Sequence, residues 1–328
     1  MIQTIGIFMG TGFDPYLNLA TEKLLLDSVK PGTCILYLWQ NQNTVVIGKN
    51  QNAWAECRTS LLDQEGGKLA RRLSGGGAVF HDVGNLNFTF LMCKEDYDLD
   101  RQVEVIRQAC ALAGIPVEKS GRNDLLAQGR KFSGNAFYQD RLHAYHHGTL
   151  MVDVDREKLG RYLSPPKAKL EAKGVASVRS RVVNLKELCP TLTVSAMATY
   201  MQEAFRQVYS CPLSPVVLTR EDQDRIEQLA QKYSSWEYLY GNPLAFSFQC
   251  EGQFPWGHIQ LQLEAKGGTV TDAKVYSDAM DWSMPEVLAK TFIGCRFDTG
   301  SLQQAVGSAR LPEDICRDLQ QLLEQQSL

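Results

Sequence analysis

The sequence predicts an α+β protein with two domains, a large one over residues 1–243 and a small one over residues 244–328. Three observations support this prediction. Apolar, β-branched runs typical of strands are interspersed with amphipathic helical patterns through the first part of the chain, without an internal repeat. A Gly-Asn-Pro sequence follows at residues 241–243, and a strictly alternating strand pattern begins soon after it. A length of 328 residues also permits two ordinary domains.

Composition and charge are those of an ordinary globular protein. Hydrophobic residues make up 44% and charged residues 22% of the chain, and 34 Lys and Arg against 37 Asp and Glu give a net charge of −3. We therefore expect no nucleic-acid partner and no membrane partner. The N-terminus lacks the pattern of a signal peptide, no apolar run approaches the roughly 20 residues of a membrane helix, and the nine cysteines include no CxxC pair. These features predict a cytoplasmic protein with reduced thiols, and a monomer is the default expectation.

The N-terminal elements are predicted in chain order. A helix begins after the N-cap Asp14, with Pro15 in its first turn, and ends at a Pro-Gly pair. The residues predicted to form its buried face are Leu17, Ala20 and Leu24. Two strands, residues 34–39 and 44–47, flank a polar turn. A helix over residues 54–65 is predicted to end at two glycines.

The remaining elements follow the same two periodicities. The pattern predicts a strand at 86–92, a helix at 103–113, a hairpin of strands 124–127 and 131–137, a strand at 147–152, and helices at 194–208 and 221–233. In the small domain, alternation of Ile259, Leu261 and Leu263 predicts a half-buried strand, with a hairpin turn at Gly267-Gly268. The C-terminal helix carries an apolar stripe of Ile315, Leu319 and Leu322.

The most informative segment is residues 71–82, which read RRLSGGGAVFHD. Glycine loses more backbone entropy on folding than any other residue, so three in a row are expected where the backbone takes a positive φ or where a ligand approaches its amides. The two arginines before them are planar donors suited to phosphate or carboxylate. An apolar Ala-Val-Phe follows. This combination predicts a loop that binds a ligand with a charged end and an apolar end; a long surface turn is the alternative.

Other candidate motifs fail on their spacing. The sequence contains no GxxxxGK[ST] run, which excludes a P-loop. Gly6, Gly10 and Gly12 do not form a GxGxxG dinucleotide fingerprint either. Residues 96–100 resemble the start of a calcium loop, but arginines stand where Gly and Glu are needed, so we expect these acids to precede and cap the next helix. His143, His146 and His147 lie close together, yet in a strand His146 and His147 point to opposite faces, which disfavours a metal site.

Lys131 is the candidate for a fixed positive charge. It opens a predicted strand whose next residues include the small Ser133, Gly134 and Ala136, so its amine could reach across a shallow surface toward the glycine loop. A lysine held among backbone donors suits a phosphate. An exposed lysine without a role is the alternative.

Taken together, these segments resemble the lipoate–protein ligase A family of the biotin/lipoate ligase superfamily. Residues 71–82, with the Gly-Asn pair that follows them, are similar to the family's lipoate-binding loop. The other similar segments, which keep the family's order within about residues 14–185, are 39–52, 121–124, 131–136 and 173–182. The small C-terminal domain is similar to that of the two-domain bacterial type. The resemblance implies a catalytic domain like those of class II synthetases, with mixed or antiparallel sheets and flanking helices.

The resemblance implies a two-step reaction that uses ATP, Mg²⁺ and lipoate. Lipoate and ATP would give enzyme-bound lipoyl-AMP and pyrophosphate, and a lysine amine of an acceptor protein would then take the lipoyl group as an amide. The implied acceptors are lipoyl domains of 2-oxoacid dehydrogenase E2 subunits or the glycine cleavage H protein. Lys131 matches the family's lysine that touches the lipoyl carbonyl oxygen and the α-phosphate, where it would stabilise developing charge.

The resemblance also implies the other site residues. Those expected to contact ATP or the adenylate are Arg72, Gly77, Ala78, Val79, Phe80, Asn123, Asp124 and Lys131. Those expected to contact lipoate are Ser74, Gly75, Gly76, His81, Lys131, His147 and Gly148. Asp124 is the candidate Mg²⁺ ligand, because magnesium on ATP is usually held by a small number of carboxylates together with phosphates. The basic stretch 167–181 is expected to close over the adenylate, with a solvated loop as the alternative.

Four other functions are considered. An octanoyl transferase of the same superfamily needs a reactive cysteine, and none lies between Cys110 and Cys189, while Cys93 and Cys110 have the pattern of core residues. A biotin ligase is disfavoured because residues 71–82 do not spell its biotin loop. A lipoyltransferase that uses preformed lipoyl-AMP and a lipoate-binding scaffold without activation both stay open, since each could keep the same pocket.

Overall fold

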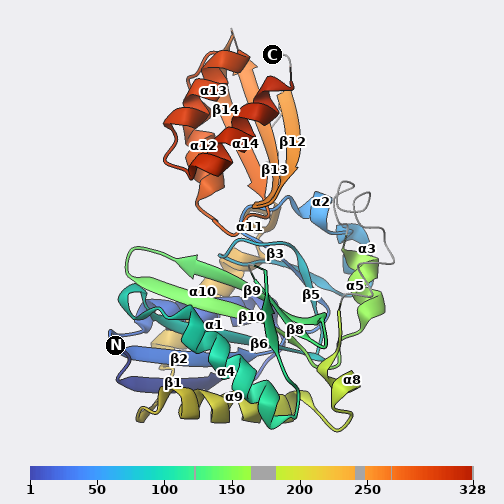
Figure 1. The fold of residues 1–328 in the computed structure, drawn as a ribbon, viewed down its shortest axis with the longest axis vertical. Coiled ribbons are helices and arrows are strands. Elements are labelled where there is room, and N and C mark those ends of the chain that lie inside the picture. Colours follow the sequence, from blue (N-terminus) through green and yellow to red (C-terminus); the bar gives the residue numbers. More distant parts are fainter. Residues whose placement is uncertain (122, 164–181, 241–247, 267, 327–328) are drawn as a thin grey trace. The chain divides into compact units, whose positions relative to one another are not determined.

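The structure is a computed structural model that describes residues 1–121, 123–163, 182–240, 248–266 and 268–326. The chain divides into two compact units (Figure 1). The first contains residues 1–46, 54–71 and 79–239, and the second contains residues 47–53, 72–78 and 240–328. The predicted α+β class is confirmed, since each unit combines a sheet with helices. The Gly-Asn-Pro sequence at 241–243 lies outside the described residues.

One mixed sheet organises the first unit. Its order is β11-β1-β2-β6-β10-β9-β8-β7. The strands are β1 (Thr4–Met9), β2 (Thr33–Trp39), β6 (Asn85–Cys93), β7 (Glu118–Ser120), β8 (Asp124–Ala127), β9 (Arg130–Gln139), β10 (His143–Met151) and β11 (Leu213–Pro215). β11 and β2 pair parallel to β1, and the other neighbours pair antiparallel. The parallel strand β1 was not predicted.

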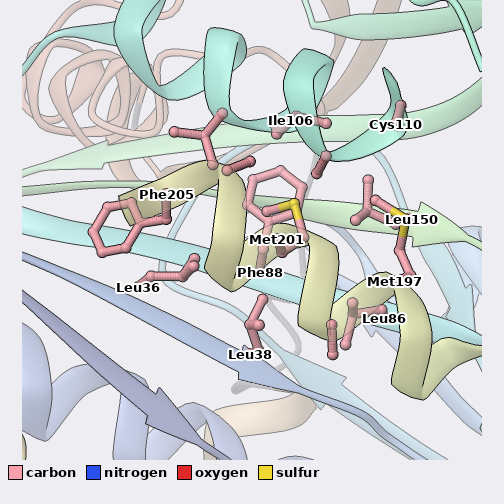
Figure 2. Close-up of a cluster of buried hydrophobic side chains, with 14 of the residues drawn as sticks. Leu36, Leu38, Leu86, Phe88, Ile106, Cys110, Leu150, Met197, Met201 and Phe205 are labelled. Atoms are coloured by element: carbon pink, nitrogen blue, oxygen red, sulfur yellow. The ribbon is translucent and has the colours of Figure 1, made fainter. Parts of the chain in front are cut away.

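Helices cover both faces of this sheet. They are α1 (Pro15–Ser28), α4 (Leu99–Leu112), α9 (Val194–Tyr209) and α10 (Arg220–Ser234). On one face, side chains of α4 and α9 pack with Leu36 and Phe88 in a single apolar core, as Figure 2 shows. On the other face, α1 and α10 pack with Tyr37, Leu91 and Tyr145. Because strand residues alternate between faces, neighbouring residues of β2 and β6 belong to different cores.

A smaller sheet and several short helices lie mainly in the first unit. The sheet has the order β4-β3-β5, and Val79 of β5 lies opposite Val46 of β3. Its strands are β3 (Thr44–Ile47), β4 (Lys68–Arg71) and β5 (Val79–His81). The short helices are η1 (Lys94–Asp96), α2 (Ala53–Glu56), α3 (Thr59–Gln64), α5 (Arg156–Tyr162), α8 (Leu185–Leu188) and α11 (Trp236–Tyr240).

The C-terminal part of the second unit is a three-stranded antiparallel sheet packed with helices. Its elements are β12 (Phe248–Phe254), β13 (Gly257–Lys266), β14 (Thr269–Ser277), α12 (Met284–Phe292), α13 (Thr299–Ser308) and α14 (Glu313–Glu324). The predicted alternation is confirmed, because Ile259, Leu261 and Leu263 are fully buried on β13. The predicted hairpin is also confirmed: Lys266 lies opposite Thr269, with Gly268 at a φ of 76°. Gly267 lies outside the described residues.

Local signals predicted several helix ends correctly. The Asp14 carboxylate accepts hydrogen bonds from the backbone N–H groups of Tyr16 at 2.8 Å and Leu17 at 3.2 Å, as an N-cap does. Asp98 likewise caps α4 by accepting from the Arg101 N–H at 3.0 Å. The C-terminal stripe is buried, with Leu319 at its centre.

Two predictions on helices were wrong, and tertiary contacts explain both. Leu17 is 42% exposed, because Asn18 takes the buried place in the first turn of α1 and donates to the Gln40 carbonyl at 2.8 Å. The helix predicted over residues 54–65 is two helices, α2 and α3. The chain breaks between them because Cys57 forms a bridge with Leu163 and the Arg58 N–H donates to the Tyr162 carbonyl.

No helix within the described ranges combines the length and the apolar character needed to cross a membrane.

Phe205 of α9 tests the core shown in Figure 2. Its ring is fully buried against Phe90, with the ring centroids 5.9 Å apart. We expect Phe205→Ala to lower the free energy of unfolding by about 3–5 kcal/mol, because it removes a large side chain and leaves a cavity. Chemical denaturation measures this change. Val217→Ala, at a residue that is 77% exposed, is the control and should change stability by less than about 0.5 kcal/mol.

Candidate active site

The β8–β9 hairpin positions Lys131. Gln128 and Gly129 both have positive φ angles, 51° and 72°, which is the geometry of a two-residue type I′ turn. The pairing register shifts after Leu125, and in the irregular stretch Phe132 turns into the buried core. The Lys131 Nζ then lies 2.7 Å from Asp124 Oδ1. Both side chains are about one-third exposed, 35% and 36%, so this ion pair stands at an accessible place on the sheet.

The amine of Lys131 lies over a bare stretch of backbone. A Cβ on Gly134 would be 3.3 Å from the Lys131 Nζ and 3.9 Å from the Thr149 Oγ1. The Gly134 N–H donates to the Thr149 hydroxyl at 3.3 Å. The backbone of Lys131 is fixed by a further hydrogen bond, in which its carbonyl accepts from the Val183 N–H at 2.9 Å. A side chain at position 134 would therefore compete with the ammonium for space.

A polar strip continues from Thr149 across the same face of the sheet. Thr149 lies opposite Asn87 on β6, and Asn87 lies opposite Trp39 on β2. The Asn87 Oδ1 accepts from the Asn85 amide at 2.9 Å, but the buried Asn87 Nδ2 has no hydrogen-bond partner among the described residues. A buried donor without a partner is costly, so this amide is available to a ligand. We call Gly134, Thr149, Asn87 and Trp39 the polar strip.

His147 stands beside this strip and is held by a buried carboxylate. Its Nδ1 lies 2.8 Å from Glu22 Oε1 on α1, and the same oxygen accepts from the Thr89 hydroxyl at 2.7 Å. Glu22 is only 1% exposed. Trp39 joins the group by donating its indole N–H to the Thr89 hydroxyl at 3.2 Å. The group is thus a hydrogen-bonded cluster between α1 and the sheet, as buried polar groups require.

The predicted residues His81, Phe80 and Gly148 have distinct environments. The ring of His81 lies edge-on to Trp39, with centroids 6.3 Å apart, and its Nδ1 is 3.2 Å from the Asn41 amide. Phe80 is buried against Tyr162. Gly148 faces the other side of the sheet, where a Cβ would be 2.6 Å from the Phe88 ring. Sequence reasoning missed this packing constraint at Gly148.

The glycine loop belongs to the second unit, and Arg72 holds its shape. Arg72 is 6% exposed, and its guanidinium donates to the carbonyls of Gly75 and Gly77, each at 2.7 Å. Gly76 has a φ of 87°, a conformation that favours glycine. The predicted contact between Arg72 and a nucleotide stays a prediction. In this structure its donors satisfy loop carbonyls.

Close backbone contacts explain two of the glycines. A Cβ on Gly75 would fall inside the contact distance of the Ala279 carbonyl oxygen, which also accepts from the Gly76 N–H at 3.2 Å. A Cβ on Gly48 would likewise strike the Gly76 carbonyl. Around Gly77, by contrast, no atom of the described residues lies within 4 Å of a Cβ. The space beside Gly77 is therefore open to a ligand.

The predicted site residues fall into two groups. Those in the first unit are Val79, Phe80, His81, Asn123, Asp124, Lys131, His147 and Gly148. Those in the second unit are Arg72, Ser74, Gly75, Gly76, Gly77 and Ala78. The predicted approach of Lys131 to the glycine loop joins residues of both units and stays a prediction. The basic stretch 167–181 lies outside the described residues.

Metal-ligating side chains gather elsewhere among the described residues. Asp27, Asp140 and His143 each present a ligand atom within 4.8 Å of the others. They lie at the end of β9 opposite to Lys131, because Asp140 follows the last residue of that strand. His146 and His147 contact different partners, Asn135 and Glu22, as their positions on opposite faces predicted. The three histidines therefore do not share an ion.

A cavity of about 850 Å³ in the first unit contains none of the predicted site residues. Its walls include Asp82, Asp153, Asp155 and Lys158. Burial raises the pKa of Asp82, although its carboxylate accepts from the Gly84 and Asp155 N–H groups, each at 2.8 Å. Asp82 thus holds the turn between β5 and β6, Asp155 caps α5, and Asp153 pairs with Lys186 at 2.5 Å. Because these acids have structural partners, the Lys131 region remains the candidate site.

Gly75→Ala tests the contact between the glycine loop and Ala279. The added methyl group would push against the Ala279 carbonyl and break the bond from the Gly76 N–H. We expect faster hydrogen exchange at Gly76 and at the nearby Ser277 amide, which donates to the Asn50 carbonyl at 2.9 Å. Exchange read by NMR measures both amides. Gly77→Ala should leave the Ser277 amide unchanged, and equal exchange in the two variants would contradict this account of Gly75.

Comparison with known proteins places this geometry in a family. The model of the lipoyl protein ligase A/B catalytic domain matches residues 14–206, and that of the bacterial lipoate protein ligase C-terminus matches residues 244–323. The chain is 40% identical over 316 residues to a lipoate-protein ligase A of Bdellovibrio bacteriovorus, covering 94% of this chain and 93% of the relative. It is 37% identical over 307 residues to a lipoate-protein ligase A of Blochmanniella pennsylvanica, covering 91% of each.

Solved structures show the same fold at low sequence identity. Plasmodium falciparum LipL1, solved in complex with lipoate, superposes with a TM-score of 0.84 at 23% identity, covering 98% of this chain and 99% of that one. A bipartite lipoate protein ligase of Thermoplasma acidophilum, described with its E2 lipoyl domain, gives a TM-score of 0.66 at 23% identity over 76% of this chain and 100% of that one. A lipoate-protein ligase A bound with ATP gives 0.64 at 22% identity, over 74% and 99%. Because the family models and these relatives match most of its length, this chain belongs to the lipoate–protein ligase A family of enzymes.

Proposed function

We propose that the protein activates lipoate with ATP and then transfers the lipoyl group to a lysine of an acceptor protein. In the first step a carboxylate oxygen of lipoate attacks the α-phosphorus, and pyrophosphate leaves. In the second step the acceptor amine attacks the acyl carbon of lipoyl-AMP, and AMP leaves with the bonding electrons. One observation carries this proposal: the partly exposed ammonium of Lys131 lies over Gly134, which has no side chain to cover it.

The charge on Lys131 suits both steps. Negative charge grows on the phosphoryl oxygens in the first step and on the acyl oxygen in the second. A cation already held beside these oxygens stabilises each transition state without reorganisation. Asp124 sets the direction of the amine at 2.7 Å, and Val183 fixes the backbone from which it extends. A single lysine can therefore serve adenylation and transfer.

The polar strip and its neighbours suit the lipoate chain. Gly134 has no side chain and Thr149 has a small one, which leaves space beside the Lys131 amine. At the other end of the polar strip, Trp39 and His81 form an aromatic wall. The unpartnered Asn87 amide offers a donor within the strip. Burial of the aliphatic chain would contribute about 0.8 kcal/mol per CH₂ group. Val79 and Phe80 follow the glycine loop directly and would complete the apolar side of the pocket.

Asp124 fits the role of a magnesium ligand on ATP. Its carboxylate is 36% exposed and is one of the oxygen ligands that Mg²⁺ prefers. A single carboxylate is sufficient in such sites, because substrate phosphates and water supply the remaining ligands. When bound, the ion would neutralise phosphate charge. Asn123 precedes Asp124 and holds it in place through the Asn135 backbone, with hydrogen bonds of 2.9 and 3.2 Å.

Lipoyl domains of E2 subunits or the H protein are the proposed acceptors, and the T. acidophilum neighbour described with its E2 lipoyl domain supports this class. The chain is proposed to act as a monomer.

An acyltransferase that works through a cysteine thioester is disfavoured, because burial raises the pKa of Cys34, Cys57 and Cys110 to about 12. Thiols that stay protonated at neutral pH are poor nucleophiles. Burial also raises the pKa of Cys93.

Exchange of labelled pyrophosphate into ATP tests the proposal. We expect exchange that depends on lipoate, because formation of lipoyl-AMP is reversible on the enzyme. Transfer from supplied lipoyl-AMP without any exchange would instead indicate a transferase. Absence of both reactions would indicate a lipoate-binding scaffold and would overturn the proposal.

Lys131→Ala should abolish the charge at the reacting centre. We expect adenylation and transfer each to fall by at least about 100-fold, the range seen when one group that stabilises a developing oxyanion is removed. The fold should survive, since the side chain is 35% exposed. Single-turnover rates of each step and a circular dichroism spectrum measure this. A near-normal rate in either step would remove Lys131 from that step.

Gly134→Ala should displace the ammonium without removing it. The new methyl group would lie 3.3 Å from the Lys131 Nζ, which is tight, and the flexible lysine would move first. We expect both rates to fall by about tenfold, which corresponds to about 1.4 kcal/mol of lost transition-state stabilisation. Gly12→Ala is the matched control, because no atom of the described residues lies within 4 Å of a Cβ there. Equal rates in the two variants would contradict the position assigned to the amine.

A further inference from the structure

On the face of the sheet opposite to the polar strip, His146 of β10 is fully buried. Aromatic rings surround it: the centroids of Phe88, Phe90 and Phe137 lie 5.3, 5.8 and 5.1 Å from the imidazole. Burial lowers its pKa to about 3, so the ring is neutral near pH 7. A neutral imidazole in an apolar core needs a partner for each nitrogen.

Two amide side chains supply these partners. The His146 Nε2 lies 2.8 Å from the Asn135 Oδ1, and the Nδ1 lies 3.1 Å from the Gln102 Oε1 on α4. A neutral ring carries one N–H, so it donates through one nitrogen and accepts through the other. The orientation of Asn135 is set independently, because its Nδ2 donates to the Asn123 carbonyl at 3.0 Å. Its Oδ1 must therefore accept, which assigns the proton to the His146 Nε2. The Gln102 Nε2 contacts only a weak acceptor there, the Met92 Sδ at 3.1 Å, so we assign the Gln102 amide the turned orientation, in which it donates to Nδ1.

The chain of contacts ends next to the ion pair of the candidate site. The Asn123 carbonyl accepts from both the side chain and the backbone N–H of Asn135, at 3.0 and 2.9 Å, and the Asn123 amide donates back to the Asn135 carbonyl at 3.2 Å. The next residue is Asp124, which holds Lys131. His146 and Asp124 also line the same narrow cavity of about 10 Å³. The His146 ring is thus linked to the backbone next to Asp124 by hydrogen bonds through Asn135 and Asn123.

We propose that His146, as its Nε2–H tautomer, is a positioning residue for adenylation, acting through Asn135 on Asn123 and Asp124. It touches no reacting group itself. The inference rests on the proposed function, and it assigns His146 to one step. Asp124 is the candidate ligand of magnesium on ATP, which takes part in adenylation. The backbone of Lys131 is anchored separately by Val183, so its ammonium stays available for transfer even when its pair with Asp124 is loosened. Disturbing His146 should therefore affect the first step more than the second.

The kinetic test compares His146→Leu with His146→Gln. The leucine keeps an apolar side chain in the core and removes both hydrogen bonds, while the glutamine keeps an N–H for Asn135. In His146→Leu we expect lipoate-dependent pyrophosphate exchange to fall by about 10–100-fold, with a higher Mg²⁺ concentration at half-maximal rate, because residues that orient metal ligands have effects of this size. Transfer from supplied lipoyl-AMP should stay within about twofold of the natural protein. His146→Gln should restore most of the exchange.

Phe90→Leu is the matched control for loss of packing. Phe90 is fully buried on the neighbouring strand, directly opposite His146, and takes no part in the hydrogen bonds. It should lower stability while leaving the ratio of the two rates unchanged. If His146→Leu lowers both steps equally, or if His146→Gln restores nothing, His146 is only structural and the proposal is overturned. Absence of exchange in the natural protein would refute the proposed function instead.

A measurement on the natural, ligand-free protein tests the tautomer directly. NMR with ¹⁵N-labelled histidine distinguishes a protonated Nε2 from a protonated Nδ1 by their nitrogen shifts and couplings. We expect His146 to show Nε2–H and an Nδ1 that accepts a hydrogen bond. An Nδ1–H tautomer would break the assigned link to Asn135 and overturn the proposal, whatever the kinetics of the variants. This result does not depend on whether His146→Leu folds.

Discussion

Alternation along β9 and β10 is the constraint on which the rest of the structure depends. Successive residues of a strand must serve opposite faces of the sheet. His146 therefore enters the core under α4, while His147 contacts Glu22 of α1. Asn135 contacts His146 on one face, and Gly134 lies beneath the Lys131 amine on the other. These two strands thus supply both the surface on which the chemistry is proposed to occur and the buried residues that support it.

The sequence predicted what depends on near neighbours. The N-cap Asp14, the β8–β9 hairpin and the alternation of Ile259, Leu261 and Leu263 are local patterns, and each appears in the structure. The turn of the hairpin is one residue shorter than predicted, because Arg130 already pairs with Ala127. The wrong predictions have distant causes. Leu17 is exposed because Asn18 bonds to a residue 22 positions away, and the helix over residues 54–65 breaks where Cys57 meets Leu163. No local pattern contains these partners.

The same distinction applies to the candidate site. Lys131 and the glycine loop could be found from residue type and spacing, because a run of glycines and a lysine among small residues are unusual in themselves. The partners that give these residues their geometry were missed. Gln102, Asn135 and His146 come from three separate elements and look like ordinary helix and strand residues in the sequence. Ala279, which presses on Gly75, is an apolar residue whose contribution is a backbone carbonyl, so its side chain gives no signal.

The backbone of Lys131 is hydrogen-bonded on one edge to Val183 and paired on the other with Leu126. With the Cα immobilised on both sides, only the side-chain torsions remain free to move the amine. Rotations about a few single bonds are fast, on the picosecond to nanosecond scale for exposed side chains. In the proposed reaction, the cation would therefore pass from one oxygen to the next between the two steps without any rearrangement of the sheet, and this movement would not limit turnover.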